Sequence, residues 1–237
     1  MRTLALLLVA ACASAQAAEP PPAAERVRRA QAVLDAELSA LAFDERGEAL
    51  AALGASGRFD ALSRLAEALK AEKGETRFAA ARGLAYLREP KAGPAIAKAF
   101  RDEKGWAVRK ELAHAAGACS VAELAPDLKK ALVDPNQELV IAAAWALKDL
   151  GDPAGAASLA RFGNPERKGA PKEGADRWSR KVLAGQKEGD KVLAARTLAE
   201  MGTADDVKLL EPLLVAPDAG LRTWAAAAIL KLAGKAP

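Results

Sequence analysis

The sequence predicts an all-α protein, a right-handed α-solenoid of stacked helical hairpins. Three observations lead to this prediction. Apolar residues recur at helical spacing along most of the chain, one positional pattern returns about every 31 residues, and turn signals separate the apolar segments in pairs. A single hairpin cannot bury its own apolar face, so the hairpins must stack into a continuous core. We expect no strands.

Residues 1–17 have the organisation of a secretory signal peptide. Arg2 supplies an early positive charge, an apolar run follows, and small residues end the segment. The apolar run is too short to span a bilayer. We expect cleavage after Ala17, with Ala15 as the second choice, and a periplasmic or secreted protein. Cys12 ends the tetrapeptide VAAC, which resembles a lipobox, so a lipoprotein is the alternative.

Residues 18–43 are expected to form a linker and a capping helix. One face of this helix would carry an apolar stripe, with most charged residues elsewhere. The terminal unit of a repeat stack needs a polar outer face, because no further unit covers it. We therefore place the helix as a cap on the N-terminal end of the stack. The stripe consists of Val27, Leu34, Leu38 and Leu41.

Residues 44–237 contain about six copies of a two-helix unit. A marker position, occupied by arginine or lysine in five units, recurs after 31, 32, 31, 51 and 31 residues. Offsets 3, 7 and 10 from the marker lie on one helical face and are mostly apolar. We expect the marker cations to bridge neighbouring units by reaching carboxylates or helix ends. The marker residues are Arg46, Arg77, Arg109, Val140, Lys191 and Arg222.

A second helix follows the first in most units. Its apolar residues come in pairs four apart, such as Leu65 and Leu69, and proline-containing turns such as "GDP" precede it. The fourth unit has only Leu159 before Gly163, so its second helix should end early. Units such as "RFAAARGLAYLREPKAGPAIAKAF" and "VIAAAWALKDLGDPAGAASLARF" resemble HEAT-like repeats, of the short kind also found in bilin lyases. This resemblance implies a curved solenoid and leaves the function open.

The 51-residue step marks an insertion, residues 163–189, rich in Gly, Pro, Lys and Arg. We expect a loop followed by a short helix anchored by Trp178, Val182 and Leu183. Insertions in repeat proteins are often used for binding, so Trp178 is a candidate binding residue. A tolerated surface insertion is the alternative. The insertion could also fold back over Trp145.

The residue inventory disfavours several enzyme classes. His114 is the only histidine, and it shares a position in the repeat with Arg82, Trp145 and Arg196, about 200° from the core stripe. We therefore expect it to be an exposed surface residue. One histidine cannot supply the paired His–Glu motifs of the di-iron hydroxylases built from HEAT-like repeats. It also disfavours a catalytic zinc site and a Ser-His-Asp hydrolase. Cys119 occupies a core position and is expected to be a small buried residue.

The second helices suggest a binding surface. Lys98, Lys130 and Arg161 occupy one position on three successive second helices, which we expect to line the concave surface. They would form a docking strip for an acidic partner, or an ordinary solvated face. The resulting hypothesis is an exported, non-enzymatic scaffold or adaptor that binds a protein or peptide. We expect this protein to need no cofactor or metal, to have no transmembrane segment and to bind no nucleic acid.

Two alternatives remain, a bilin-lyase-like helper enzyme and a HEAT-like nucleic-acid-binding protein. The formal charge of +4 is only mildly basic, and the signal peptide disfavours a role on genomic DNA.

Overall fold

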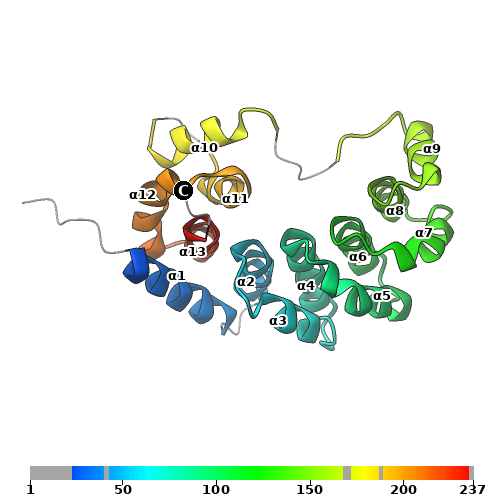
Figure 1. The fold of residues 1–237 in the computed structure, drawn as a ribbon, viewed down its shortest axis with the longest axis horizontal. Coiled ribbons are helices and arrows are strands. Elements are labelled where there is room, and N and C mark those ends of the chain that lie inside the picture. The colour runs from blue at the N-terminus through cyan, green and yellow to red at the C-terminus, as the bar shows by residue number, and fades with distance from the viewer. Residues whose placement is uncertain (1–22, 40–42, 168–171, 187–188, 235–237) are drawn as a thin grey trace, which may run out of the picture.

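The computed structural model describes residues 23–39, 43–167, 172–186 and 189–234. These residues form helices and their connections, and none of them is in a strand. The predicted signal peptide and Leu41 lie outside the described residues. The helices form a curved stack that bends into an open ring (Figure 1).

The first helices of the units line the inside of the ring (Figure 1). These inner helices are α2 (Phe43–Ser56), α4 (Gly74–Leu87), α6 (Trp106–Ala118), α8 (Gln137–Asp149), α11 (Lys191–Met201) and α13 (Ala219–Ala233).

The remaining helices lie on the outside of the ring (Figure 1). They are α1 (Ala23–Leu38), α3 (Ala61–Ala68), α5 (Gly93–Asp102), α7 (Ala125–Ala131), α9 (Pro153–Arg161), α10 (Ala175–Leu183) and α12 (Val207–Leu210). As predicted, α9 ends before Gly163, and the insertion contains a helix, α10.

The predicted register is confirmed by burial. The residue seven positions after each marker is completely buried. Ten positions after the marker, Met201 is the clear exception, with 38% of its surface exposed. Asparagine or aspartate caps begin four helices, since the side chains of Asn136, Asp152, Asp190 and Asp218 accept backbone N–H bonds. The buried residues seven positions after the markers are Leu53, Leu84, Ala116, Leu147, Leu198 and Ile229.

The order of the units in space differs from their order in the sequence. Helices α2, α4, α6 and α8 stack in chain order, but α11 packs on α13, and α13 packs on α2. The stack therefore runs α11, α13, α2, α4, α6, α8, with both ends of the repeat sequence meeting in its middle. The units therefore do not all stack in chain order. The 51-residue step has a structural reason, because the chain must cross from one end of the stack to the other (Figure 1).

We had expected the N-terminal helix α1 to cap an end of the stack, but it does not. It packs on the outside of α13 and α2, where an outer helix belongs. Leu34 and Leu38 are buried in this contact, whereas Val27 is only half-buried. The sixth unit thus takes its inner helix from the C-terminal region and its outer helix from the N-terminal region.

The marker arginines show that α1 takes the part of an ordinary outer helix. Arg77 donates hydrogen bonds to two carbonyl oxygens of the preceding turn, at 2.8 and 2.7 Å, and pairs with Glu103 at 2.7 Å. Arg222 likewise donates to two carbonyl oxygens, at 2.8 and 2.9 Å, and pairs with Glu37 of α1 at 2.7 Å. Glu37 therefore does for α13 what Glu103, at the end of α5, does for α4.

The predicted bridging role holds for part of the marker column. Arg109 pairs with Asp134 at 3.4 Å in a similar arrangement, which makes three bridging arginines. Arg46 and Lys191 form no ion pair with a described residue. Burial opposes ionisation of Glu103, but hydrogen bonds from Arg77 and the backbone of Gly105 keep the pKa of this carboxyl below its usual value.

The inner helices lie inside the curve because they approach one another closely. A Cβ atom added to Gly54 of α2 would lie 1.9 Å from the carbonyl oxygen of Gly83 in α4, so neither helix tolerates a side chain there. Alanine surrounds these positions in both helices. In a curved stack, the row with the shorter spacing lies on the concave side. The small residues of the first helices therefore determine which row faces inward.

Candidate binding site

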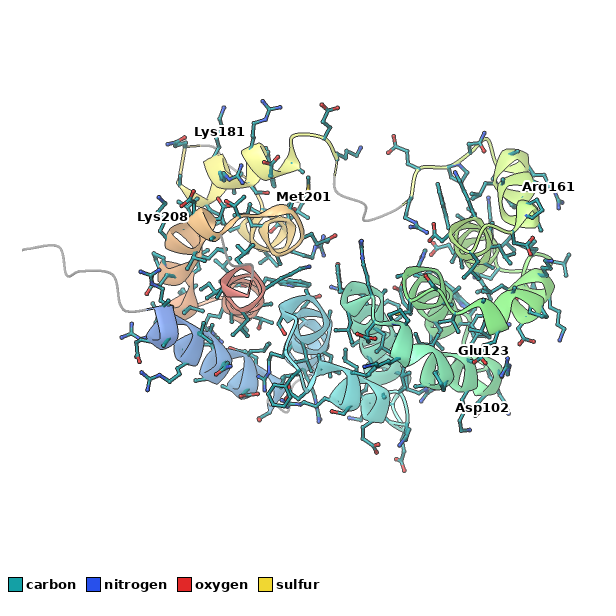
Figure 2. The ribbon with its side chains drawn as sticks, in the orientation of Figure 1. Asp102, Glu123, Arg161, Lys181, Met201 and Lys208 are labelled. Carbon is teal, nitrogen blue, oxygen red and sulfur yellow. The ribbon has the colours of Figure 1, made fainter. Side chains whose placement is uncertain are left out.

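The predicted docking strip lies on the outer surface. Lys98, Lys130 and Arg161 belong to α5, α7 and α9, and Figure 2 shows Arg161 at the outer edge of the ring. The expectation that these helices line the concave surface is wrong. Lys98 pairs with Asp102 at 2.5 Å and Lys130 with Asp127 at 3.2 Å, and both lysine side chains are more than three-quarters exposed. A role of this strip in binding stays a prediction.

Trp178 lies away from these three residues, on α10. Its side chain is half-buried and packs toward Gly189, where an added Cβ atom would lie 2.8 Å from the indole ring. Arg180 anchors the same helix through Asp206, with contacts of 2.7 and 3.0 Å. The expected anchoring of α10 is thus observed, with Val182 buried beside Trp178. The binding role of Trp178 stays a prediction.

The concave side of the ring contains a cavity of about 450 Å³. Its walls come from α4, α6, α8 and α11, together with residues 165–167 of the segment that crosses between the ends of the stack. Arg82, His114, Trp145 and Arg196, which share one repeat position, all line it. The sequence correctly places this position away from the core, but it does not show that these side chains converge on one cavity in the ring. The available signal was that four units carry a large polar or aromatic residue, Arg, His, Trp or Arg, at this position.

Trp145 is covered by cations at the α8 end of the cavity. The Lys148 ammonium lies 4.6 Å from the ring centroid, and the Arg167 guanidinium carbon lies 5.0 Å from it. Arg167 also pairs with Asp149. The insertion therefore folds back over Trp145, as one of our hypotheses predicted. The indole Nε1 is buried and has no hydrogen-bond partner among the described residues.

His114 is half-buried rather than exposed, so that expectation is wrong. Burial, together with the positive charges of Arg167 and Lys110, lowers the pKa of His114 to about 4, against the opposing attraction of Asp149. The imidazole is therefore neutral at physiological pH. It offers one donor and one acceptor to the cavity, without a charge.

A row of alternating charges crosses the concave wall from α2 to α8. Glu48 accepts hydrogen bonds from Arg82 at 3.0 Å and from the buried Trp224 indole at 2.7 Å. Farther along, Lys110 pairs with Glu138 at 3.0 Å and lies 3.7 Å from Glu111. Burial raises the pKa of Glu111, although the nearby cations favour its charged form. These pairs connect adjacent inner helices and hold the wall in one arrangement.

The other end of the cavity lies between α4 and α11. The rings of Tyr86 and Trp224 meet edge to face, with centroids 5.4 Å apart, and the Arg196 guanidinium lies 5.9 Å from the Trp224 centroid. Arg88 ends α4 in a left-handed conformation with φ of 55°. Burial raises the pKa of Glu200. The positive charges of Arg88, Lys231 and Arg196 act in the opposite direction, because they favour its charged form. Neither Arg88 nor Arg196 forms an ion pair with a described residue.

The rest of the described chain offers little catalytic chemistry. Cys119 is buried as predicted, its thiol donates to the Leu84 carbonyl oxygen at 3.4 Å, and burial raises its pKa to about 11. In the ranges that the structure describes, no group of three His, Cys, Asp or Glu residues could hold a metal ion. No helix in these ranges has both the length and the apolar character needed to cross a membrane.

Comparisons with known proteins support the repeat assignment. Residues 30–117 match the family model for HEAT repeats. A search of curated proteins found no match. Among solved structures, the chain is similar to one in the complex of CpcE and CpcF of phycocyanin lyase from Nostoc sp. PCC7120, with 21% identity and a TM-score of 0.47. The alignment covers 88% of this chain and 85% of that one.

A crystal structure of an engineered protein is similar with 18% identity and a TM-score of 0.38, over 86% of this chain and 98% of that one. At these values the two structures give no information about the substrate or partner of this chain. Residues 30–117 thus match the model for HEAT repeats, and a similar two-helix unit continues in the structure as far as α13.

Proposed function

We propose that the protein is a non-enzymatic adaptor that holds a segment of a partner protein in its concave cavity. The observation that supports this most directly is the cavity itself. It gathers polar and aromatic side chains from four inner helices and the crossing segment, at the centre of an otherwise alanine-rich stack. Curved repeat proteins commonly use their concave surface for binding.

The chemistry of the cavity favours binding over catalysis. His114 is the obvious candidate for a general base, but its lowered pKa makes it a weak one, and no described nucleophile is hydrogen-bonded to it. Cys119 is buried and un-ionised at physiological pH. Carboxylates of Glu111, Glu138 and Glu200 share the walls with the cations, which disfavours nucleic acid. Residues 1–17 support the further proposal that the adaptor is exported.

Site-specific photo-crosslinking tests the proposal. A photoreactive amino acid replaces Ile141, which lines the cavity, and in a separate variant replaces Lys98 on the outer surface. Both variants are expressed in the native host and irradiated, and the adducts are identified by mass spectrometry. The same sample gives the mature N-terminus and thereby tests export.

We expect an adduct with one defined protein from position 141 and none from position 98. Adding Trp145→Ala to the Ile141 variant should weaken that adduct, because the indole forms part of the same wall. Adducts from position 98 alone would show that the partner binds the outer strip of Lys98, Lys130 and Arg161 and not the cavity. Conversion of a bound small molecule by the purified protein would contradict the non-enzymatic assignment.

A further inference from the structure

We infer that the bound partner segment is acidic, and that Arg88 and Arg196 bind one of its carboxylates at the α4–α11 end of the cavity. This inference rests on the proposed function and adds the chemistry of the occupant. It also moves the acidic partner from the outer strip, where the sequence suggested it, to the concave side.

The first argument is the pairing of the cavity cations. Arg82 is paired with Glu48, Lys110 with Glu138, and Arg167 with Asp149. These three cations are already neutralised by carboxylates of the wall, so they contribute little to the binding of an incoming negative charge. Arg88 and Arg196 differ from them, since neither guanidinium forms an ion pair with a described residue. An arginine fork is best satisfied by a planar carboxylate, which it can bind through two parallel hydrogen bonds.

The second argument is the local balance of charge. Glu200 is the carboxyl that Arg88, Arg196 and Lys231 all attract, and Glu200 forms no direct ion pair with any of the described residues. Two arginines that form no ion pair with a described residue, Arg88 and Arg196, therefore act on one partly buried carboxyl. The positive excess is placed to receive a second carboxylate, which would complete the pairing of the two arginines.

The third argument is the fixed position of Arg196. Its guanidinium lies 5.9 Å from the Trp224 ring centroid, and that ring is completely buried and held by Glu48 and Tyr86. A cation held over a rigid aromatic ring loses little conformational freedom when a ligand binds. Tyr86 and Trp145 offer aromatic surface along the same cavity for the neighbouring part of the segment.

The inference predicts the direction of proton transfer on binding. A carboxylate placed beside Arg88 and Arg196 competes with Glu200 for the same cations, so the pKa of Glu200 rises further. Binding of an acidic segment should therefore take up protons in mildly acidic solution. A cationic segment would stabilise the charged Glu200 and release protons instead.

The experiment measures the fluorescence anisotropy of three labelled Gly-Ser peptides with purified mature protein at low ionic strength. One peptide carries several glutamates, and the other two carry glutamine or lysine at the same positions. We expect the glutamate peptide to bind most tightly. Arg196→Gln and Arg88→Gln should each weaken it about tenfold, the loss of one charge-assisted contact. Arg161→Gln alters an outer-surface arginine that forms no ion pair with a described residue, so it is the matched control and should leave the affinity unchanged.

Calorimetry in two buffers of different protonation enthalpy supplies the proton count, and thermal melts confirm that each variant folds. Arg88 is exposed at a helix end, so Arg88→Gln tests the inference even if Arg196→Gln disturbs the Trp224 contact. Several results would overturn the inference: no binding of the glutamate peptide, equal binding of the glutamine peptide, proton release, or an equal loss in Arg161→Gln. If position 141 still crosslinks a partner in those cases, the proposed function stands and only the acidic occupant is wrong.

Discussion

The contact between Arg222 and Glu37 tests whether the two ends of the sequence share one repeat unit. These residues lie 185 positions apart in the chain, yet the Glu37 side chain is only 9% exposed and that of Arg222 is 27% exposed. We propose a double-mutant cycle with Arg222→Met and Glu37→Leu, which keep the apolar volume and remove the charges. The matched cycle uses Arg77→Met and Glu103→Leu, a pair with exposures of 26% and 7%.

The expected energies follow from this burial. A net contribution of about 1.5–3 kcal/mol is typical for a hydrogen bond to a charged group, against about 0–1 kcal/mol for a surface ion pair. Because Glu37 is nearly buried, we expect a coupling energy of about 1.5–3 kcal/mol. Arg222→Met alone should cost about 2–4 kcal/mol, since it also leaves Glu37 buried without its partner and two carbonyl oxygens without a donor.

Urea denaturation of the purified protein, followed by circular dichroism, measures both cycles under identical conditions. The two coupling energies should agree within about 1 kcal/mol, because the geometry of the two sites is nearly the same. A coupling near zero for Arg222 and Glu37, alongside a normal value for Arg77 and Glu103, would refute the closure of the stack by α1.

Four further outcomes are expected. Leu147→Asp should lower the free energy of unfolding by about 3–5 kcal/mol, because it buries an unpaired charge, and a variant that melts like wild type would show the register to be wrong. His114 has a pKa lowered from 6.5 to about 4, so the unfolded chain binds its proton first on acidification. Stability should therefore fall between these pH values by up to roughly 3 kcal/mol, and much less in His114→Asn, as measured by urea denaturation across this range. Cys119 should resist iodoacetamide in the folded protein and react after unfolding, as peptide mass spectrometry can show. Trypsin should cut first at Lys172, whose side chain is 83% exposed, and early cleavage within residues 79–87 would contradict this.

The sequence was sufficient to predict the secondary structure and the buried face of each helix. Alanine and leucine at offsets 3, 7 and 10 can be buried in only one way, because those offsets share one face of a helix. Burial of Leu53, Leu84 and Leu147 follows directly from this spacing. The end of α9 before Gly163 and the helix within the insertion were also predictable, from Gly163 and from the apolar residues around Trp178.

The binding surface was only partly predictable. Sequence reasoning identified the position shared by Arg82, His114, Trp145 and Arg196 as lying away from the core. It treated that position as open surface and placed the concave side on the second helices. Which row faces inward depends on how closely neighbouring helices approach, as at Gly54 and Gly83, and that distance is a property of pairs of helices.

The sequence by itself determined the repeat unit, its register and the buried role of Cys119, since each depends on residues within one or two turns of helix. Only the tertiary structure decided that α13 packs on α2, that α1 completes its unit, and that the ring encloses a cavity. The physical reason is that every inner helix presents a similar alanine-rich face, so many neighbours would fit equally well by pattern. The choice among them is made by long-range contacts such as Glu37 with Arg222 and Glu48 with Trp224, which no local pattern encodes.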